Sequence, residues 1–282
     1  MKIKILIFWF VMVPILKSNE VNVICIKSIH DVQDKVLELL KDYAAEEVLV
    51  AVDVDMTLTL LIHPATYYPN IIRHKEALKN IFKDLSDVQK DAVLTLVVTK
   101  STQKLVESDS PKIIKNLQKL GVKVIAFTAS LTGSWKYSKN KIIFKRKDYL
   151  QSLGFNFSFL GRVVSYMDFP KYADGFPMLY HGVLCANGEH NGIGKGKVLT
   201  AFLKQISVNK DGSTYYKPKV IVMVDDKKKN LEDTKIALET EYPDIKLIAL
   251  EYQGSLNYAP EEISENDFIK YWEGLAEQVS GK

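Results

Sequence analysis

The segment Val48–Leu60 reads VLVAVDVDMTLTL and gives the strongest indication of the fold class. Its first half is an apolar run rich in β-branched residues, which is typical of a strand buried on both faces of a parallel sheet. The run ends in Asp53 and Asp55, with Thr57 two residues further on. Because side chains alternate along a strand, both aspartates are expected to project in the same direction. The segment therefore predicts a pair of carboxylates at the end of a central strand.

A pair of neighbouring carboxylates is by itself an ambiguous signal. The two groups repel each other unless a cation or a proton lies between them, so the pair is typical of a chemical site. Aspartates at a strand end can also simply cap a turn. The remaining strands of the chain decide between these two readings.

Two later strand patterns also end in polar side chains. Val122–Phe127 runs directly into Thr128, whose hydroxyl is suited to a phosphate oxygen. Val220–Val224 runs into Asp225 and Asp226, which carry the oxygen ligands that hard divalent cations prefer. Each of these groups alone could be a turn or helix cap. Together they predict several polar groups at one edge of a sheet.

A lysine completes the pattern between these two strands. Lys195 lies in Gly194–Leu199, where glycines precede an amphipathic helical run. A lysine at the start of a helix can neutralise a phosphate, although it can equally be solvated. A P-loop is excluded here, because Glu189 stands where that motif needs glycine and Gly196 where it needs a hydroxyl.

In this order, the four groups resemble the motifs of the haloacid-dehalogenase-like (HAD) superfamily. The matching positions are Asp53-x-Asp55-x-Thr57, Thr128, Lys195 and the pair Asp225-Asp226. An aspartate two residues after the first one is typical of the phosphatases and phosphotransferases of that superfamily, whereas dehalogenases lack it. The Lys195 segment, which follows an apolar stretch rich in Gly and Asn, is most similar to an exported bacterial group.

The resemblance implies a role for each matched residue. Asp53 would be the nucleophile, and Asp55 would act as general acid and then as general base. Mg²⁺ would be held by the Asp53 carboxylate, the main-chain carbonyl of Asp55 and Asp225, with Asp226 adjacent or bridged by water. Thr128 and Lys195 would bind the phosphoryl oxygens of a small phosphorylated substrate.

The charge of the substrate explains this combination of residues. A phosphomonoester is anionic, so a carboxylate can approach its phosphorus only when a cation and a lysine offset the negative charge. Hydrolysis of a phosphomonoester through an aspartyl-phosphate is therefore the leading hypothesis. The alternatives are transfer of the phosphoryl group to an acceptor alcohol, and a non-catalytic protein that binds a phosphorylated ligand on the same scaffold.

The chain is long enough for one α/β domain with insertions. It has 282 residues, of which 47% are hydrophobic, and strand patterns alternate with helical ones. This predicts a three-layer, Rossmann-like, mainly parallel sheet. We assign residues 28–60 and 110–282 to the core, 61–109 to a helical cap insertion, and 131–189 to a second irregular insertion that belongs partly to the core.

The N-terminal residues resemble an export signal. Lys2 and Lys4 precede the apolar run Ile5–Leu16, so residues 1–18 are predicted to be a signal peptide. The protein would then be periplasmic or secreted, or membrane-anchored if the leader is uncleaved. The two cysteines, Cys25 and Cys185, can form one disulfide or remain separate thiols.

Charge excludes one class of partner. The formal net charge is +4, and the lysines are dispersed without a long basic block. Nucleic acid is therefore not an expected partner, and no stable membrane partner is expected unless the leader is uncleaved.

Overall fold

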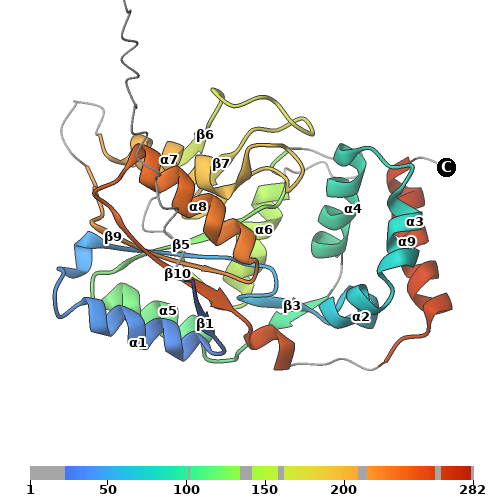
Figure 1. The fold of residues 1–282 in the computed structure, drawn as a ribbon, viewed down its shortest axis with the longest axis horizontal. Coiled ribbons are helices and arrows are strands. Elements are labelled where there is room, and N and C mark those ends of the chain that lie inside the picture. The colour runs from blue at the N-terminus through green and yellow to red at the C-terminus, as the bar shows by residue number, and fades with distance from the viewer. Residues whose placement is uncertain are drawn as a thin grey trace, which may run out of the picture.

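The computed structural model describes residues 23–100, 102–133, 142–157, 162–208, 215–257 and 262–280. The predicted leader at residues 1–18 lies outside these ranges. Among the described residues, none of the helices combines the length and the apolar composition that a bilayer-spanning segment needs. The predicted α/β class is confirmed, since a mostly parallel central sheet is covered by helices on both faces (Figure 1).

The central sheet has eight strands in the described part of the chain, in the order β1-β10-β9-β2-β5-β8-β7-β6. Each neighbouring pair from β1 to β8 in this order is parallel, and β7 and β6 continue the sheet in antiparallel fashion. The strands are β1 (Val23–Ile26), β2 (Val48–Val52), β5 (Lys123–Thr128), β6 (Val163–Ser165), β7 (Met178–Tyr180), β8 (Val183–Cys185), β9 (Val220–Asp225) and β10 (Lys246–Tyr252).

Helices cover both faces of this sheet. Figure 1 shows α1 and α5 on one face, with α7 and α8 on the other. Their bounds are α1 (Ile29–Leu39), α5 (Ser110–Lys119), α7 (Gly194–Ile206) and α8 (Lys228–Glu241). Strand β2 separates two hydrophobic cores, because Val48, Val50 and Val52 pack with α1 and α5 while Leu49 and Ala51 pack with α7. This alternation explains why the strand reads as an unbroken apolar run.

The chain leaves β2 earlier than the sequence pattern indicated. The strand ends at Val52, and Asp55 lies in a turn around Met56, which has a φ of 64°. Two hydrogen bonds close this turn, from the Met56 amide to the Thr59 carbonyl and from the Thr59 amide to the Val54 carbonyl, both 2.8 Å. The expectation that Asp53 and Asp55 share a direction along one strand is therefore wrong.

A cluster of helices stands beside the sheet. The chain enters it through β3 (Thr59–Leu61) and leaves through the antiparallel partner β4 (Gln103–Leu105). The helices between these strands are α2 (Tyr68–Arg73), α3 (Lys75–Phe82) and α4 (Asp87–Lys100). Leu96 and Val97 are among the residues that form its own small core.

The C-terminal helix α9 (Glu265–Ser280) completes this helical cluster. Phe268 and Trp272 of α9 pack into the same core as Val93 of α4, and the Trp272 indole donates to the Ala65 carbonyl at 2.9 Å. Residues 110–282 are predicted to belong to the core domain, whereas α9 packs with the inserted helices. The apolar face of α9 finds its partner far away in sequence, which local periodicity cannot reveal.

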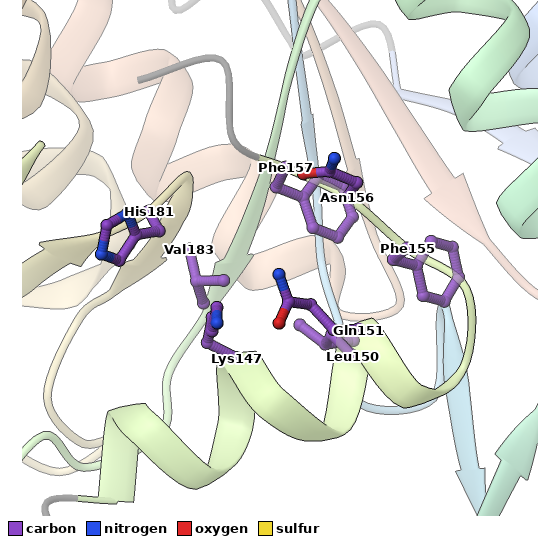
Figure 2. A pocket seen from close by; sticks show the side chains of 8 residues that line it. All are labelled: Lys147, Leu150, Gln151, Phe155, Asn156, Phe157, His181 and Val183. Atoms are coloured by element: carbon purple, nitrogen blue, oxygen red, sulfur yellow. The ribbon is translucent and has the colours of Figure 1, made fainter. Parts of the chain in front are cut away.

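The described parts of segment 131–189 extend the sheet rather than form a separate lobe. They include β6, β7, β8 and α6 (Ile142–Ser152), and Phe155 and Phe157 are buried in the core beneath them. A cavity of about 140 Å³ lies against α6, lined by residues such as Leu150, Gln151 and Phe157 (Figure 2).

The two cysteines are free thiols in very different surroundings. Cys25 is exposed on β1, whereas Cys185 is buried on β8, with several strands between them. Burial raises the pKa of the Cys185 thiol to about 12.

We expect a thiol-specific chromogenic reagent at neutral pH to modify Cys25 alone in the native protein and both cysteines after unfolding. A failure to modify either one in the unfolded, unreduced protein would indicate a disulfide instead.

Candidate active site

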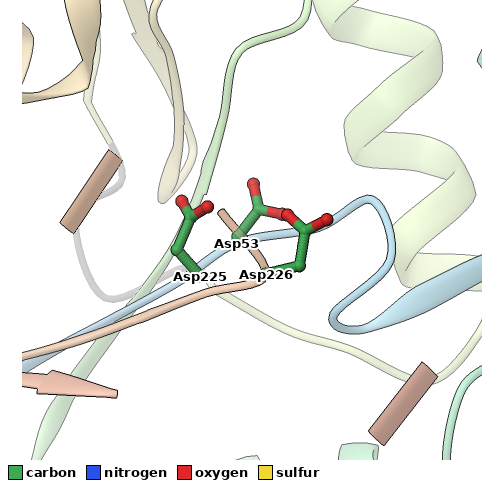
Figure 3. Close-up of side chains that lie close together, drawn as sticks. All are labelled: Asp53, Asp225 and Asp226. Atoms are coloured by element: carbon green, nitrogen blue, oxygen red, sulfur yellow. The ribbon is translucent and has the colours of Figure 1, made fainter. Parts of the chain in front are cut away.

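Three carboxylates converge at the carboxyl edge of the sheet. Strands β2 and β9 are parallel neighbours with Val52 opposite Val224, and the Asp53 amide donates to the Val224 carbonyl at 2.8 Å. The two strands therefore end at the same level of the sheet. Asp53 directly follows β2, and Asp225 is the last residue of β9. Carboxylate oxygens of Asp53, Asp225 and Asp226 lie within 4.8 Å of one another (Figure 3).

The ammonium group of Lys195 bridges two of these acids. Its Nζ lies 2.5 Å from Asp53 Oδ1 and 2.6 Å from Asp225 Oδ2, and it also donates to the Phe127 carbonyl at 3.0 Å. Lys195 is in the first turn of α7, and only 3% of it is exposed. Strand alternation explains why Asp53 reaches Lys195. Side chains two residues apart point to the same face, so Asp53 lies on the face of Leu49 and Ala51, which α7 covers.

Burial and the charges of neighbouring acids raise the pKa of both Asp53 and Asp226. Burial raises the pKa of Asp53 well above its ordinary value; Lys195 opposes that shift, and the neighbouring acids Asp225, Asp226 and Asp55 add to it. Burial, followed by the charge of Asp225, raises the pKa of Asp226 to about 7. Burial alone would lower the pKa of Lys195, but Asp225 and Asp53 outweigh it and raise the pKa. One ammonium thus only partly compensates three carboxylates.

The orientation of Asp225 is set by its own loop. Its Oδ1 accepts hydrogen bonds from the Lys227 amide at 3.0 Å and from Asn230 Nδ2 at 2.8 Å, while its Oδ2 is held by Lys195. Asp225 is fully buried. Its position is therefore fixed before any ligand arrives, which is the preorganisation that a binding or catalytic site requires.

The donor set fits a hard divalent cation. The three clustered side chains offer only carboxylate oxygens, which Mg²⁺ and Ca²⁺ prefer over nitrogen or sulfur ligands. A cation here would also offset the repulsion that raises the pKa of Asp53 and of Asp226. The side chain of Asp55 lies outside this cluster.

Asp55 belongs to a second group of polar side chains. Its Oδ2 accepts a hydrogen bond from Thr128 Oγ1 at 3.4 Å and forms an ion pair with Arg146 Nη2. Arg146 also donates through Nε to Ser130 Oγ at 3.1 Å, and Ser130 Oγ lies 3.1 Å from Thr128 Oγ1. This group is built from the turn after β2, the end of β5 and helix α6.

Sequence reasoning missed Arg146. The arginine is only 2% exposed although it lies in α6, a helix whose sequence reads as a mixture of charged and apolar residues. An arginine in such a helix is usually solvated, and no local spacing distinguishes a buried one. Its partner Asp55 lies 91 positions earlier in the chain, so only the tertiary structure reveals the pair.

A buried aspartate joins the helical cluster to the loop before α7. Asp91 of α4 accepts hydrogen bonds from Tyr172 Oη at 2.7 Å and from the His190 amide at 3.2 Å, and it pairs with His190 Nδ1 at 2.8 Å. Gly188 passes so close that a Cβ there would meet the Asp91 carboxylate at 2.6 Å. The helical cluster is thus anchored directly against the loop that leads to Lys195.

The structure brings the predicted site residues to one edge of the sheet. Asp53, Asp225, Asp226 and Lys195 form one connected group, and Asp55 and Thr128 form the adjoining one. Thr57 Oγ1 lies 3.4 Å from Asp53 Oδ2, within the first group. Asp53, Lys195 and Asp225 are thus in direct contact with one another through the lysine ammonium.

Comparison with known proteins assigns the chain to a family. A family model described as "Protein of unknown function (DUF2608)" matches residues 25–279. The chain belongs to this family. The matched range includes every site residue described above and all of α9 except Ser280, so the acidic edge and the helical cluster both lie inside the family region. No curated protein matches the chain.

Replacement of Lys195 should expose the repulsion between its two partners. Lys195→Met leaves Asp53 and Asp225 buried without their cation, so we expect a loss of about 3–5 kcal/mol in the free energy of unfolding in the presence of a chelator. Added Mg²⁺ should recover part of this loss, because a cation can replace the ammonium charge. Urea unfolding followed by circular dichroism measures both effects.

The matched control is Lys197→Met in the same helix. Lys197 is exposed, so its replacement should change stability by no more than about 0.5 kcal/mol. Equal stability of the Lys195 and Lys197 variants would contradict the structural role of the buried ammonium.

Proposed function

We propose that the chain is a Mg²⁺-dependent phosphomonoester hydrolase that works through an aspartyl-phosphate on Asp53. The observation that carries the proposal is the buried Lys195 ammonium shared by Asp53 and Asp225, with Asp226 beside them. A carboxylate next to a fixed ammonium and a cation-binding group of oxygens is suited to attack an anionic phosphorus centre. The motif resemblance to the HAD superfamily supports the same chemistry.

The first half of the reaction transfers the phosphoryl group to the protein. An Asp53 oxygen forms a bond to phosphorus while the bond from phosphorus to the ester oxygen breaks. In the form that reacts, the Asp55 carboxyl carries a proton taken up from solvent and gives it to that ester oxygen, which leaves as an alcohol. Lys195 and Thr128 donate hydrogen bonds to the phosphoryl oxygens.

The second half restores the protein. Asp55 takes a proton from water as the water oxygen attacks phosphorus, and the bond between phosphorus and Asp53 breaks. Inorganic phosphate leaves. Mg²⁺, when held by Asp53, Asp225 and Asp226, would neutralise charge on the phosphoryl group.

The two oxygens of Asp55 are suited to different tasks. Arg146 and Thr128 both contact Oδ2, which leaves Oδ1 without a hydrogen-bond partner among the described residues. The Asp55 side chain is 34% exposed, in contrast to the buried Asp53. We assign proton transfer to Oδ1 and anchoring to Oδ2, so Arg146 is a positioning residue that acts through Asp55. A protein that only binds a ligand has no need of such an anchored, accessible carboxyl group.

Asp53→Asn tests the nucleophile. An amide cannot form the aspartyl-phosphate, so turnover of an aryl phosphate with Mg²⁺ should fall by at least about a thousandfold while the circular dichroism spectrum is unchanged. Asp244→Asn, an exposed aspartate before β10, is the control and should retain full turnover. Mass spectrometry after acid quenching should detect a phosphate adduct on the wild-type peptide that contains Asp53.

The outcomes of this assay separate the competing functions. Unchanged turnover in Asp53→Asn would remove Asp53 as nucleophile. Binding of esters without hydrolysis, with or without Mg²⁺, would identify a non-catalytic binding protein. Formation of a new ester when glycerol is added would identify a phosphotransferase.

Arg146→Ala tests the positioning role. Loss of the anchor for Asp55 should lower kcat about 100-fold with a much smaller change in KM, since proton transfer is misaligned while the phosphate ligands remain. Millimolar guanidinium ion should partly restore kcat by occupying the vacated space beside Asp55. A general structural collapse would lower kcat without any recovery, and that result would contradict the assignment.

A further inference from the structure

A cavity of about 300 Å³ lies between the acidic edge of the sheet and the helical cluster. Its walls toward the helices are apolar and come from β3, α2, α3, α4 and α9. The side chains that form these walls are Leu61, Ile71, Leu78, Leu94, Val97 and Trp272. Segments far apart in sequence thus meet around one apolar space.

The other end of the same cavity is polar and belongs to the proposed site. Asp55, Ser130 and Asp226 are part of its lining. The cavity is therefore continuous with the residues assigned to proton transfer and cation binding. A substrate whose phosphate is attacked by Asp53 and whose leaving oxygen faces Asp55 can place its remaining atoms in this space.

The polar groups of the apolar walls are already engaged within the protein. The Trp272 indole donates to the Ala65 carbonyl, and Thr66 Oγ1 donates to the His63 carbonyl at 2.6 Å. Asp91 is occupied by Tyr172 and His190. A hydroxyl-rich leaving group would lose its hydrogen bonds to water there without replacement, which is costly. A hydrocarbon group would instead gain from burial.

We propose that the substrate is a phosphomonoester of a largely apolar alcohol, with its hydrocarbon part in this cavity. The inference rests on the proposed function and adds the class of leaving group. A volume of about 300 Å³ has room for a medium-length alkyl chain or a ring, and the apolar walls rather than the volume argue against a nucleoside.

A series of esters with the same phosphate and different leaving groups tests the inference. The probes are methyl, butyl, hexyl and octyl phosphate, with glycerol 1-phosphate and glucose 6-phosphate as polar counterparts, all with Mg²⁺ and below micellar concentrations. We expect kcat/KM to rise about fourfold for each added methylene until the cavity is full. The polar esters should remain below hexyl phosphate.

Two negative results are distinguishable. Hydrolysis of the polar esters with kcat/KM equal to or above that of the alkyl esters would overturn the inference and leave the proposed hydrolase intact. No hydrolysis of any ester would overturn the proposed function, and the inference with it.

Variants in the cavity wall locate the effect. Leu94→Trp fills part of the cavity and should lower kcat/KM for octyl phosphate by about tenfold or more, while methyl phosphate changes by less than about threefold. Leu78→Trp fills part of the cavity from α3, with the same expected effect on kcat/KM. It is the second test if the Leu94 variant fails to fold. The matched control is Gln151→Trp, which places the same side chain at the separate cavity beside α6 (Figure 2) and should leave the chain-length preference unchanged. An unaltered preference in both wall variants would overturn the inference.

Discussion

The buried contact of Lys195 with Asp53 and Asp225 is the interaction on which the site depends. A buried ammonium is tolerated only when its charge and its hydrogen-bond donors are satisfied, and here two carboxylates and the Phe127 carbonyl do so. The contact joins helix α7 to the ends of β2 and β9. It therefore fixes the relative positions of three segments that are distant in sequence.

The parallel register of β2 and β9 places Asp53 and Asp225 close enough for Lys195 to contact both. The polar side chains at this carboxyl edge of the sheet form two groups, one on each face. Asp53 and Asp225 lie on the side of the sheet covered by α7, where they meet Lys195. Thr128 meets Asp55 and the buried Arg146, which comes from α6 in the core on the other face. The nucleophile and the acid–base residue assigned in the proposed function are thus supported by different helices. Each can be oriented independently, although both lie close to one edge.

The helical cluster gives this edge a specific environment. It consists of the insertion between β3 and β4 together with α9, and its apolar side chains wall the cavity that reaches Asp55 and Asp226. The buried Asp91 and its hydrogen bonds to the 188–190 loop tie the cluster to the segment that precedes Lys195. A generic α/β edge supplies polar groups, whereas these helices supply the shape and polarity that would select a substrate.

The sequence alone determined the α/β class, the central strand β2 and the residues at its end. Long apolar runs and acids at strand ends are local signals. They are sufficient to predict a site made of Asp53, Thr128, Lys195, Asp225 and Asp226. Three features became evident only in three dimensions: the turn that separates Asp55 from β2, the burial of Arg146 and the packing of α9 against the inserted helices. These features depend on contacts between residues far apart in the chain, and the pattern of neighbouring residues carries no information about such contacts.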